Sequence, residues 1–170
     1  MRKLIFLLLI SLTVTSQAAQ DSWSTAFGQG YAEHILRNNE DRSKALRVMC
    51  VISPDSKEAH HIILQQGNKN YSTLDRAQAL AFQINEGQKI MPSNTMNWQN
   101  GANNWDTFIR DLSYSEKINV FSKGKKIATF NIKPPRYKAS REGMAKCTYE
   151  ADRYRFGTER YYEAEKLFRR

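Results

Sequence analysis

The pairing of two cysteines constrains the fold of this chain more than any other feature. Cys50 and Cys147 are the only cysteines among its 170 residues, so a single intramolecular disulfide is possible. Such a bridge closes a loop of roughly a hundred residues, which the chain-entropy model values at roughly 4–5 kcal/mol. Whether the bridge forms depends on the redox state of the compartment in which the protein works.

Residues 1–18 indicate an oxidising compartment. Arg2 and Lys3 precede the apolar run 4–10, and Ser16 and Ala18 supply the small side chains that signal peptidase requires before its cut. The apolar core is shorter than the roughly 20 residues of a spanning helix. We therefore expect a cleaved secretory signal peptide, with the cut after Ala18 or one residue later.

The mature protein is then periplasmic or secreted, and we expect it to be soluble and bacterial, with no transmembrane segment. In that setting Cys50 and Cys147 are expected to form a disulfide. The chain has 26 basic and 17 acidic residues; without Arg2 and Lys3, 24 basic and 17 acidic residues leave a net charge of +7. Outside the cytoplasm this charge favours an anionic surface or a protein partner over nucleic acid.

Alternating apolar and polar residues predict an antiparallel β-sheet or a small β-sandwich. The clearest strand covers residues 45–52, with a partner strand at 60–65, and the segment 77–91 also favours strands. Residues 117–132 predict a hairpin with Gly124 in its turn.

Helices are expected to cover this sheet. Apolar residues at helical spacing predict a short helix over residues 105–112, capped by Asn103 or Asn104, after an Asn-rich loop. Aromatic residues at every fourth position predict a marginal helix over 22–37. From Ala139 onward the pattern indicates a long C-terminal helix that carries Cys147 on its apolar face.

These elements give an α+β fold class and three parts of the chain. Residues 1–18 form the signal peptide, residues 19–155 a single domain, and residues 156–170 a helical tail. A helix that covers the sheet would bring Cys147 to Cys50 on the strand.

The residues favour binding over catalysis. The three histidines, His34, His60 and His61, are expected at the surface, and His60 and His61 would point to opposite faces of a strand. Neither a nucleophile motif nor a zinc-binding spacing occurs. We expect no enzyme activity, no metal and no cofactor.

Two regions are candidates for contact with a partner. Trp98 stands beside the Asn-rich loop, where a large aromatic side chain can anchor a partner. The tail alternates basic and aromatic residues and would present an amphipathic surface to a protein or an anionic surface. Its candidate contact residues are Arg155, Tyr161, Tyr162 and Phe168.

Four segments also suggest a family. They are residues 46–50 with the first cysteine, 105–109 with Trp105, the hairpin 118–132, and 144–147 with the second cysteine. In this order the chain resembles small periplasmic proteins of the type VI secretion accessory group and proteins like invasion-associated locus B. It departs from them in its long basic tail and in Pro134 and Pro135. The resemblance implies a non-catalytic envelope protein with a β-sandwich-like core.

Three functions remain as hypotheses. The first is a non-enzymatic interaction or accessory protein of the cell envelope or of a secretion system. The second is an immunity or inhibitor protein against a toxin or a cell-wall hydrolase, and the third is a periplasmic hydrolase.

Overall fold

The structure is a computed structural model, and it describes residues 21–52, 59–93, 99–132, 143–144 and 147–148. The expected signal peptide, Trp98 and the tail with Arg155, Tyr161, Tyr162 and Phe168 lie outside the described residues.

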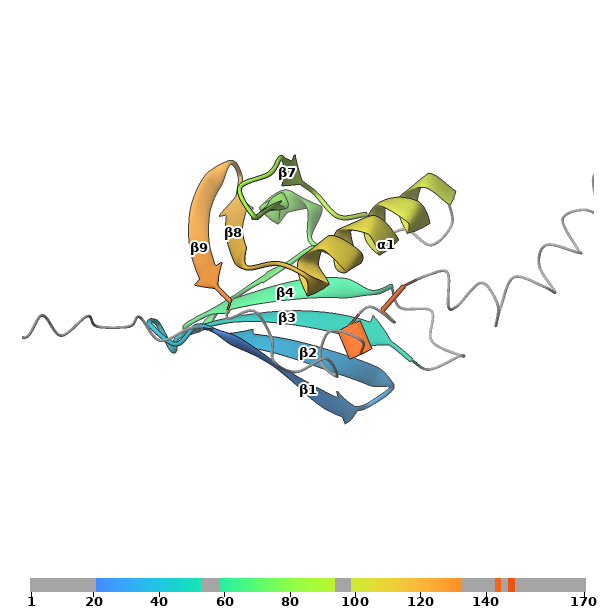
Figure 1. The fold of residues 1–170 in the computed structure, drawn as a ribbon, viewed down its shortest axis with the longest axis horizontal. Helices are drawn as coiled ribbons and strands as arrows, with labels where there is room; N and C mark the ends of the chain where they lie inside the picture. Colours follow the sequence, from blue (N-terminus) through green and yellow to red (C-terminus); the bar gives the residue numbers. More distant parts are fainter. Residues whose placement is uncertain (1–20, 53–58, 94–98, 133–142, 145–146, 149–170) are drawn as a thin grey trace, which may run out of the picture.

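Two antiparallel sheets and one α-helix make up the described fold (Figure 1). The first sheet has the order β1-β2-β3-β4-β5, and the second has the order β7-β6-β8-β9. The strands of the first sheet are β1 (Ser22–Gly28), β2 (Tyr31–Arg37), β3 (Lys44–Val51), β4 (His61–Gln66) and β5 (Lys69–Ser72). The remaining elements are the 3₁₀ turn η1 (Arg76–Gln78), β6 (Leu80–Ile84), β7 (Lys89–Ile90), α1 (Gln99–Ser113), β8 (Lys117–Ser122) and β9 (Lys125–Asn131).

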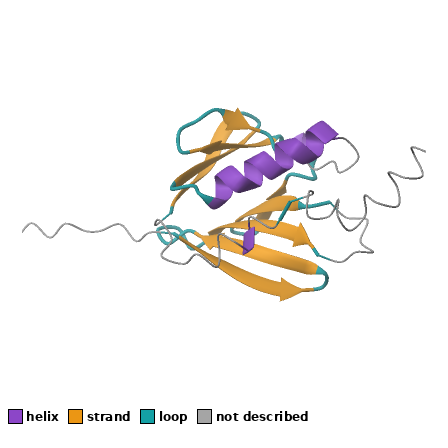
Figure 2. Cartoon of the chain, turned by 45° about the vertical axis from the view of Figure 1, so that its right-hand side comes forward, coloured by secondary structure: helices purple, strands orange, loops and turns teal. Residues whose placement is uncertain are grey.

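The inner faces of both sheets and one face of α1 share a single core. Its largest fully buried side chains include Leu46 and Ile62 from the first sheet, Phe82 and Phe130 from the second, and Trp105 from α1. In both views α1 lies over one face of the first sheet and beside the second sheet (Figures 1 and 2). The described residues therefore combine antiparallel sheets with a helix, as expected, but among the described elements α1 stands in place of the several covering helices that were predicted.

The strands at 45–52 and 60–65 and the hairpin at 117–132 are confirmed within a residue or two at each end. Along β3, Leu46, Val48 and Cys50 are buried, whereas Arg47 and Met49 are only half-buried on the opposite face. Alternate burial is what a strand with one face on the core requires.

The helix expected over residues 22–37 is wrong, because this segment is the hairpin β1–β2. A four-residue spacing of aromatic side chains fits a strand as well as a helix, since four is twice the strand period. Gln29 and Gly30 form the two-residue turn, with φ of 50° and 83°. Two successive residues with positive φ are typical of the tight hairpin turn, and they end any helix.

The helix α1 begins at Gln99 rather than at Asn103 or Asn104. Its apolar stripe starts one turn earlier than expected, because Ala102 is buried three residues before Trp105. The neighbouring asparagines, which suggested a loop, lie on the opposite side of the helix and are exposed.

The predicted disulfide between Cys50 and Cys147 is present, with a Cα–Cα distance of 5.2 Å. Both cysteines are buried, at 3% and 2% exposure. Cys147 is nevertheless not on a helix: Gly143 and Met144 are helical, and Cys147 closes a turn by donating its N–H to the Met144 carbonyl at 2.9 Å. The long C-terminal helix is not shown, and most of it falls outside the described residues.

Candidate binding groove

A groove runs along the exposed side of α1, opposite its apolar stripe. It consists of two open cavities of about 390 Å³ and about 330 Å³ that share Ile90. One wall is a polar stripe on α1 and just beyond its end, made of Asn100, Asn103, Asn104, Thr107, Asp111 and Tyr114. The other wall is the β6–β7 hairpin, represented by Ile84, Asn85, Gly87, Gln88 and Ile90.

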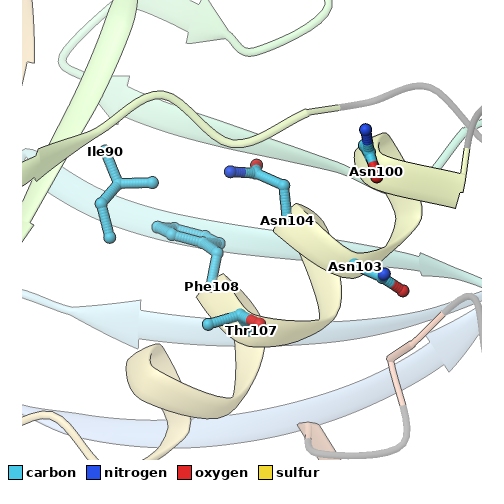
Figure 3. A pocket seen from close by; sticks show the side chains of 6 residues that line it. All are labelled: Ile90, Asn100, Asn103, Asn104, Thr107 and Phe108. Carbon is cyan, nitrogen blue, oxygen red and sulfur yellow. The ribbon is translucent and has the colours of Figure 1, made fainter.

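The larger cavity lies over the first half of α1 (Figure 3). Ile90 and the buried ring of Phe108 form its apolar part, and three asparagines and a threonine line the rest. The Oδ1 atom of Asn104 accepts a hydrogen bond from the Ser93 N–H at 2.9 Å. This bond fixes the amide plane, and Figure 3 shows the Asn104 amide nitrogen on the side of Ile90.

The smaller cavity has a rigid wall. Asn85 adopts φ of 46°, and its Oδ1 accepts the backbone N–H groups of Glu116 at 2.8 Å and Lys117 at 3.0 Å. Gly87 donates its N–H to the Ile84 carbonyl at 2.8 Å, and a Cβ atom at position 87 would lie 3.1 Å from that oxygen. The turn is therefore held in place before any ligand arrives.

The groove carries little charge. Among its described lining residues only Asp111 has a side chain with a formal charge, and Tyr114 is 57% exposed at one end. Each asparagine amide can both donate and accept hydrogen bonds. Amides beside an apolar patch suit an uncharged polar ligand, such as a peptide backbone or a sugar, and they offer neither a nucleophile nor a general base.

This groove was not predicted from the sequence. Asn100, Asn103, Asn104 and Thr107 follow the i, i+3, i+4, i+7 spacing of one helix face, and this polar stripe was a usable signal. Its second wall could not be found in the same way, because residues 84–90 meet α1 only through the folding of the chain.

The three histidines are buried, so the expectation that they lie at the surface is wrong. His34, His60 and His61 are exposed by only 2%, 2% and 8%. His60 and His61 do point to opposite faces: the ring of His60 lies 5.9 Å from Trp105 in the core, and that of His61 lies 6.1 Å from Tyr31 on the outer face. Burial removes all three from direct reach of a substrate.

His34 lies on the inner face of β2. Its Nδ1 atom is 3.0 Å from the Thr25 hydroxyl, and its buried Nε2 atom has no hydrogen-bond partner among the described residues. Burial lowers the pKa of His34 to about 4. The imidazole is therefore neutral at neutral pH and acts as a packing residue.

Trp105 lies in the core and contacts the residue that closes the disulfide. It is fully buried, and its indole Nε1–H donates to the carbonyl oxygen of Cys147 at 2.9 Å. This bond joins α1 to the residue that closes the Cys50–Cys147 bridge.

The lysines of the β8–β9 hairpin lie at an exposed edge of the second sheet. Lys123, Lys125 and Lys126 are exposed, while Lys117 pairs with Glu86 at 2.7 Å and lowers the pKa of that carboxylate.

Within the described ranges, no three His, Cys, Asp or Glu side chains come together as a set of metal ligands. In the same part of the chain, no helix has the length and apolar character needed to cross a membrane.

A family model described as YfjT matches residues 21–134. The chain belongs to the YfjT family. The matched residues include both sheets and α1, so the groove lies within the part of the chain that the family model covers. Cys147 lies after that part.

Two relatives come from Escherichia coli strain K12. The uncharacterized protein YfjT is 27% identical over 120 residues, which are 69% of this chain and 76% of that protein. The uncharacterized protein YkfB is 28% identical over 111 residues, or 64% of this chain and 70% of that protein. No solved structure matches the chain. The resemblance to secretion accessory proteins and to invasion-associated locus B stays a prediction.

Proposed function

We propose that this member of the YfjT family is an exported periplasmic protein that binds another envelope protein and catalyses no reaction. The α1 groove is the observation that carries the proposal, because it offers an open, nearly uncharged surface with a preformed wall. The location rests on the leader-like residues 1–18 and on the buried Cys50–Cys147 disulfide, since disulfides persist in oxidising compartments.

An extended, uncharged peptide segment is the ligand that fits this groove best. The short strand β7 is an edge of the second sheet and lies along the groove through Ile90. An edge strand can pair with an added strand, and the amides of Asn100, Asn103 and Asn104 can bond to its backbone. The half-buried Ile90 would then contact one side chain of the peptide.

Buried histidines support binding over hydrolysis. A hydrolase usually places a histidine, a nucleophile or a metal where the substrate can reach it. Here the histidines are enclosed, the cysteines are bridged, and most of the polar side chains that line the described groove are amides. The assignment to a secretion system rests on the motif resemblance alone. The alternative of an immunity or inhibitor protein differs only in the partner, which would be a toxin or a cell-wall hydrolase.

Affinity capture from periplasmic extract with chemical cross-linking tests the proposal. Wild-type protein is compared with Asn103→Arg and Thr107→Arg, which put a long charged side chain into the groove. Asn68→Arg on the exposed β4–β5 turn is the matched control. We expect wild type and the control to recover the same partner, and the groove variants to recover at least tenfold less.

A synthetic peptide from the cross-linked segment of the partner then completes the test. It should bind wild type and Asn68→Arg and fail to bind Asn103→Arg. Equal binding by the groove variants would remove the groove from the function, and binding of cell-wall glycan in place of a peptide would refute a protein ligand. Removal of residues 156–170 shows separately whether Arg155, Tyr161, Tyr162 and Phe168 contribute. A toxin or wall hydrolase as the partner would select the immunity alternative.

A further inference from the structure

Strand β1 is an unprotected sheet edge. It pairs with β2 alone among the described strands, and both views place it at the outer border of the first sheet (Figures 1 and 2). Six of its seven residues are exposed, and Phe27 is 76% exposed. Proteins usually protect such edges with charges, prolines or bulges, but the sequence of β1, Ser-Trp-Ser-Thr-Ala-Phe-Gly, contains no charge and no proline.

The other edge strands differ from β1. Strands β5 and β7 have four and two residues and each contains a lysine. Strand β9 begins with Lys125 and Lys126, and the Asp21 N–H donates to the Asn131 carbonyl at its end. A long uncharged edge is therefore particular to β1 among the described sheets.

The hydrogen-bond pattern defines which backbone groups of β1 face outward. The two-residue turn makes Gly28 and Tyr31 a hydrogen-bonded pair, and such pairs alternate along an antiparallel ladder. The bond from the Ile52 N–H to the Gly30 carbonyl at 2.9 Å requires the same alternation across β2. The N–H and C=O groups of Trp23, Thr25 and Phe27 consequently point to the open edge.

These outward groups are self-complementary. If a second copy pairs antiparallel about a two-fold axis at Thr25, then Thr25 faces Thr25 of the other copy. Trp23 faces the other copy's Phe27, and Phe27 faces its Trp23. All three outward N–H groups and all three outward carbonyls of each copy are then satisfied.

The side chains fit the same axis. Trp23, Thr25 and Phe27 lie on one face of β1, because they stand opposite Leu36, His34 and Ala32. The pairing therefore brings two Trp–Phe pairs and one Thr–Thr pair together on a single face. Aromatic and Thr–Thr cross-strand pairs stabilise antiparallel sheets, and the uncharged β1 brings no like charges together when two basic chains meet.

We propose that two copies of this chain associate through β1 to form a continuous ten-stranded antiparallel sheet. The dimer is two-fold symmetric, with the same surface contributed by each copy. It covers the exposed Phe27 ring with the Trp23 of the partner copy. This association does not depend on the α1 groove.

Sedimentation velocity over a range of protein concentrations tests the dimer. Phe27→Asp removes both aromatic pairs, and we expect the dissociation constant to rise at least tenfold. Phe27→Pro also deletes an outward N–H that β2 does not use, so the β1–β2 pairing is kept while dimerisation weakens. The matched control is Leu74→Asp, since Leu74 is an exposed apolar residue away from β1 and its loss should leave the dissociation constant unchanged.

Amide hydrogen exchange gives an independent readout at the backbone. The N–H groups of Trp23, Thr25 and Phe27 should exchange more slowly as the protein concentration rises. Those of Ser24 and Ala26, which bond to β2, should not change with concentration. The proposal is overturned if the wild-type protein is monomeric at every concentration, or if Phe27→Asp still forms the dimer. It is also overturned if the β1 edge pairs only with a strand of another protein.

Discussion

At the scale of single residues, His34 makes stability depend on pH. Its pKa is about 4 in the fold because the imidazole is buried, compared with an ordinary value of 6.5. Between these values the unfolded chain binds a proton that the folded chain does not, so the free energy of unfolding falls as the pH drops from 6.5 toward 4. The loss is at most about 3 kcal/mol.

Urea unfolding at several pH values checks this prediction. His34→Gln stays uncharged throughout, so it should lose less stability than wild type between pH 6.5 and 4. Parallel losses in the two proteins would show that His34 is not the responsible group.

Asp21 joins distant parts of the chain at one end of the sheets. It is 3% exposed, and its carboxylate accepts the N–H groups of Asn39 at 2.7 Å and Asn131 at 2.9 Å. Burial raises the pKa of Asp21, and these two hydrogen bonds oppose that effect.

Asp21→Ala leaves both N–H groups without this acceptor, so we expect the free energy of unfolding to fall by about 2–3 kcal/mol. Ser22→Ala, at an exposed neighbour, should change it by less than about 0.5 kcal/mol. Chemical denaturation measures both, and equal effects would contradict the role assigned to Asp21.

At the scale of elements, α1 is held to the first sheet through Trp105. Trp105→Phe keeps an aromatic ring but removes the hydrogen bond to the Cys147 carbonyl and leaves a small cavity. We expect a loss of about 2–4 kcal/mol in the free energy of unfolding. Trp23→Phe, at a half-buried position of β1, should lower the free energy of unfolding by less than Trp105→Phe does. A larger loss for Trp23→Phe would contradict the role given to Trp105 in the core.

The elements show what the sequence could and could not predict. Residues 45–52 and 117–132 were predicted because alternation with one buried face fits a strand and excludes a helix. The hairpin 22–37 was missed because a four-residue spacing fits both structures, and only the conformation of Gln29 and Gly30 decides between them.

Sites proved harder to predict than strands for a physical reason. The burial of His34, His60 and His61 depends on what packs over each strand, and a single sequence does not contain that information. The groove likewise needs residues 84–90 beside α1. The disulfide was predictable because two cysteines leave only one intramolecular pairing, although the local structure around Cys147 was not.

At the scale of the whole molecule, the Cys50–Cys147 bridge ties β3 to the last described segment. Replacing both cysteines with alanine should lower the free energy of unfolding by about 2–5 kcal/mol, because the unfolded chain loses a crosslink across 97 residues of sequence separation. Thermal unfolding of the double variant under oxidising conditions measures this effect. A midpoint equal to that of wild type would mean that the bridge contributes nothing to stability.

Export is the central proposal, since it would explain the disulfide and would restrict the partners to those of the envelope. The intact mass of the protein in periplasmic and cytoplasmic fractions, taken with thiol labelling before and after reduction, tests it directly. We predict a periplasmic species that begins at Ala19 or one residue later, whose two cysteines react only after reduction. A full-length chain in the cytoplasm with two freely reactive thiols would contradict the account.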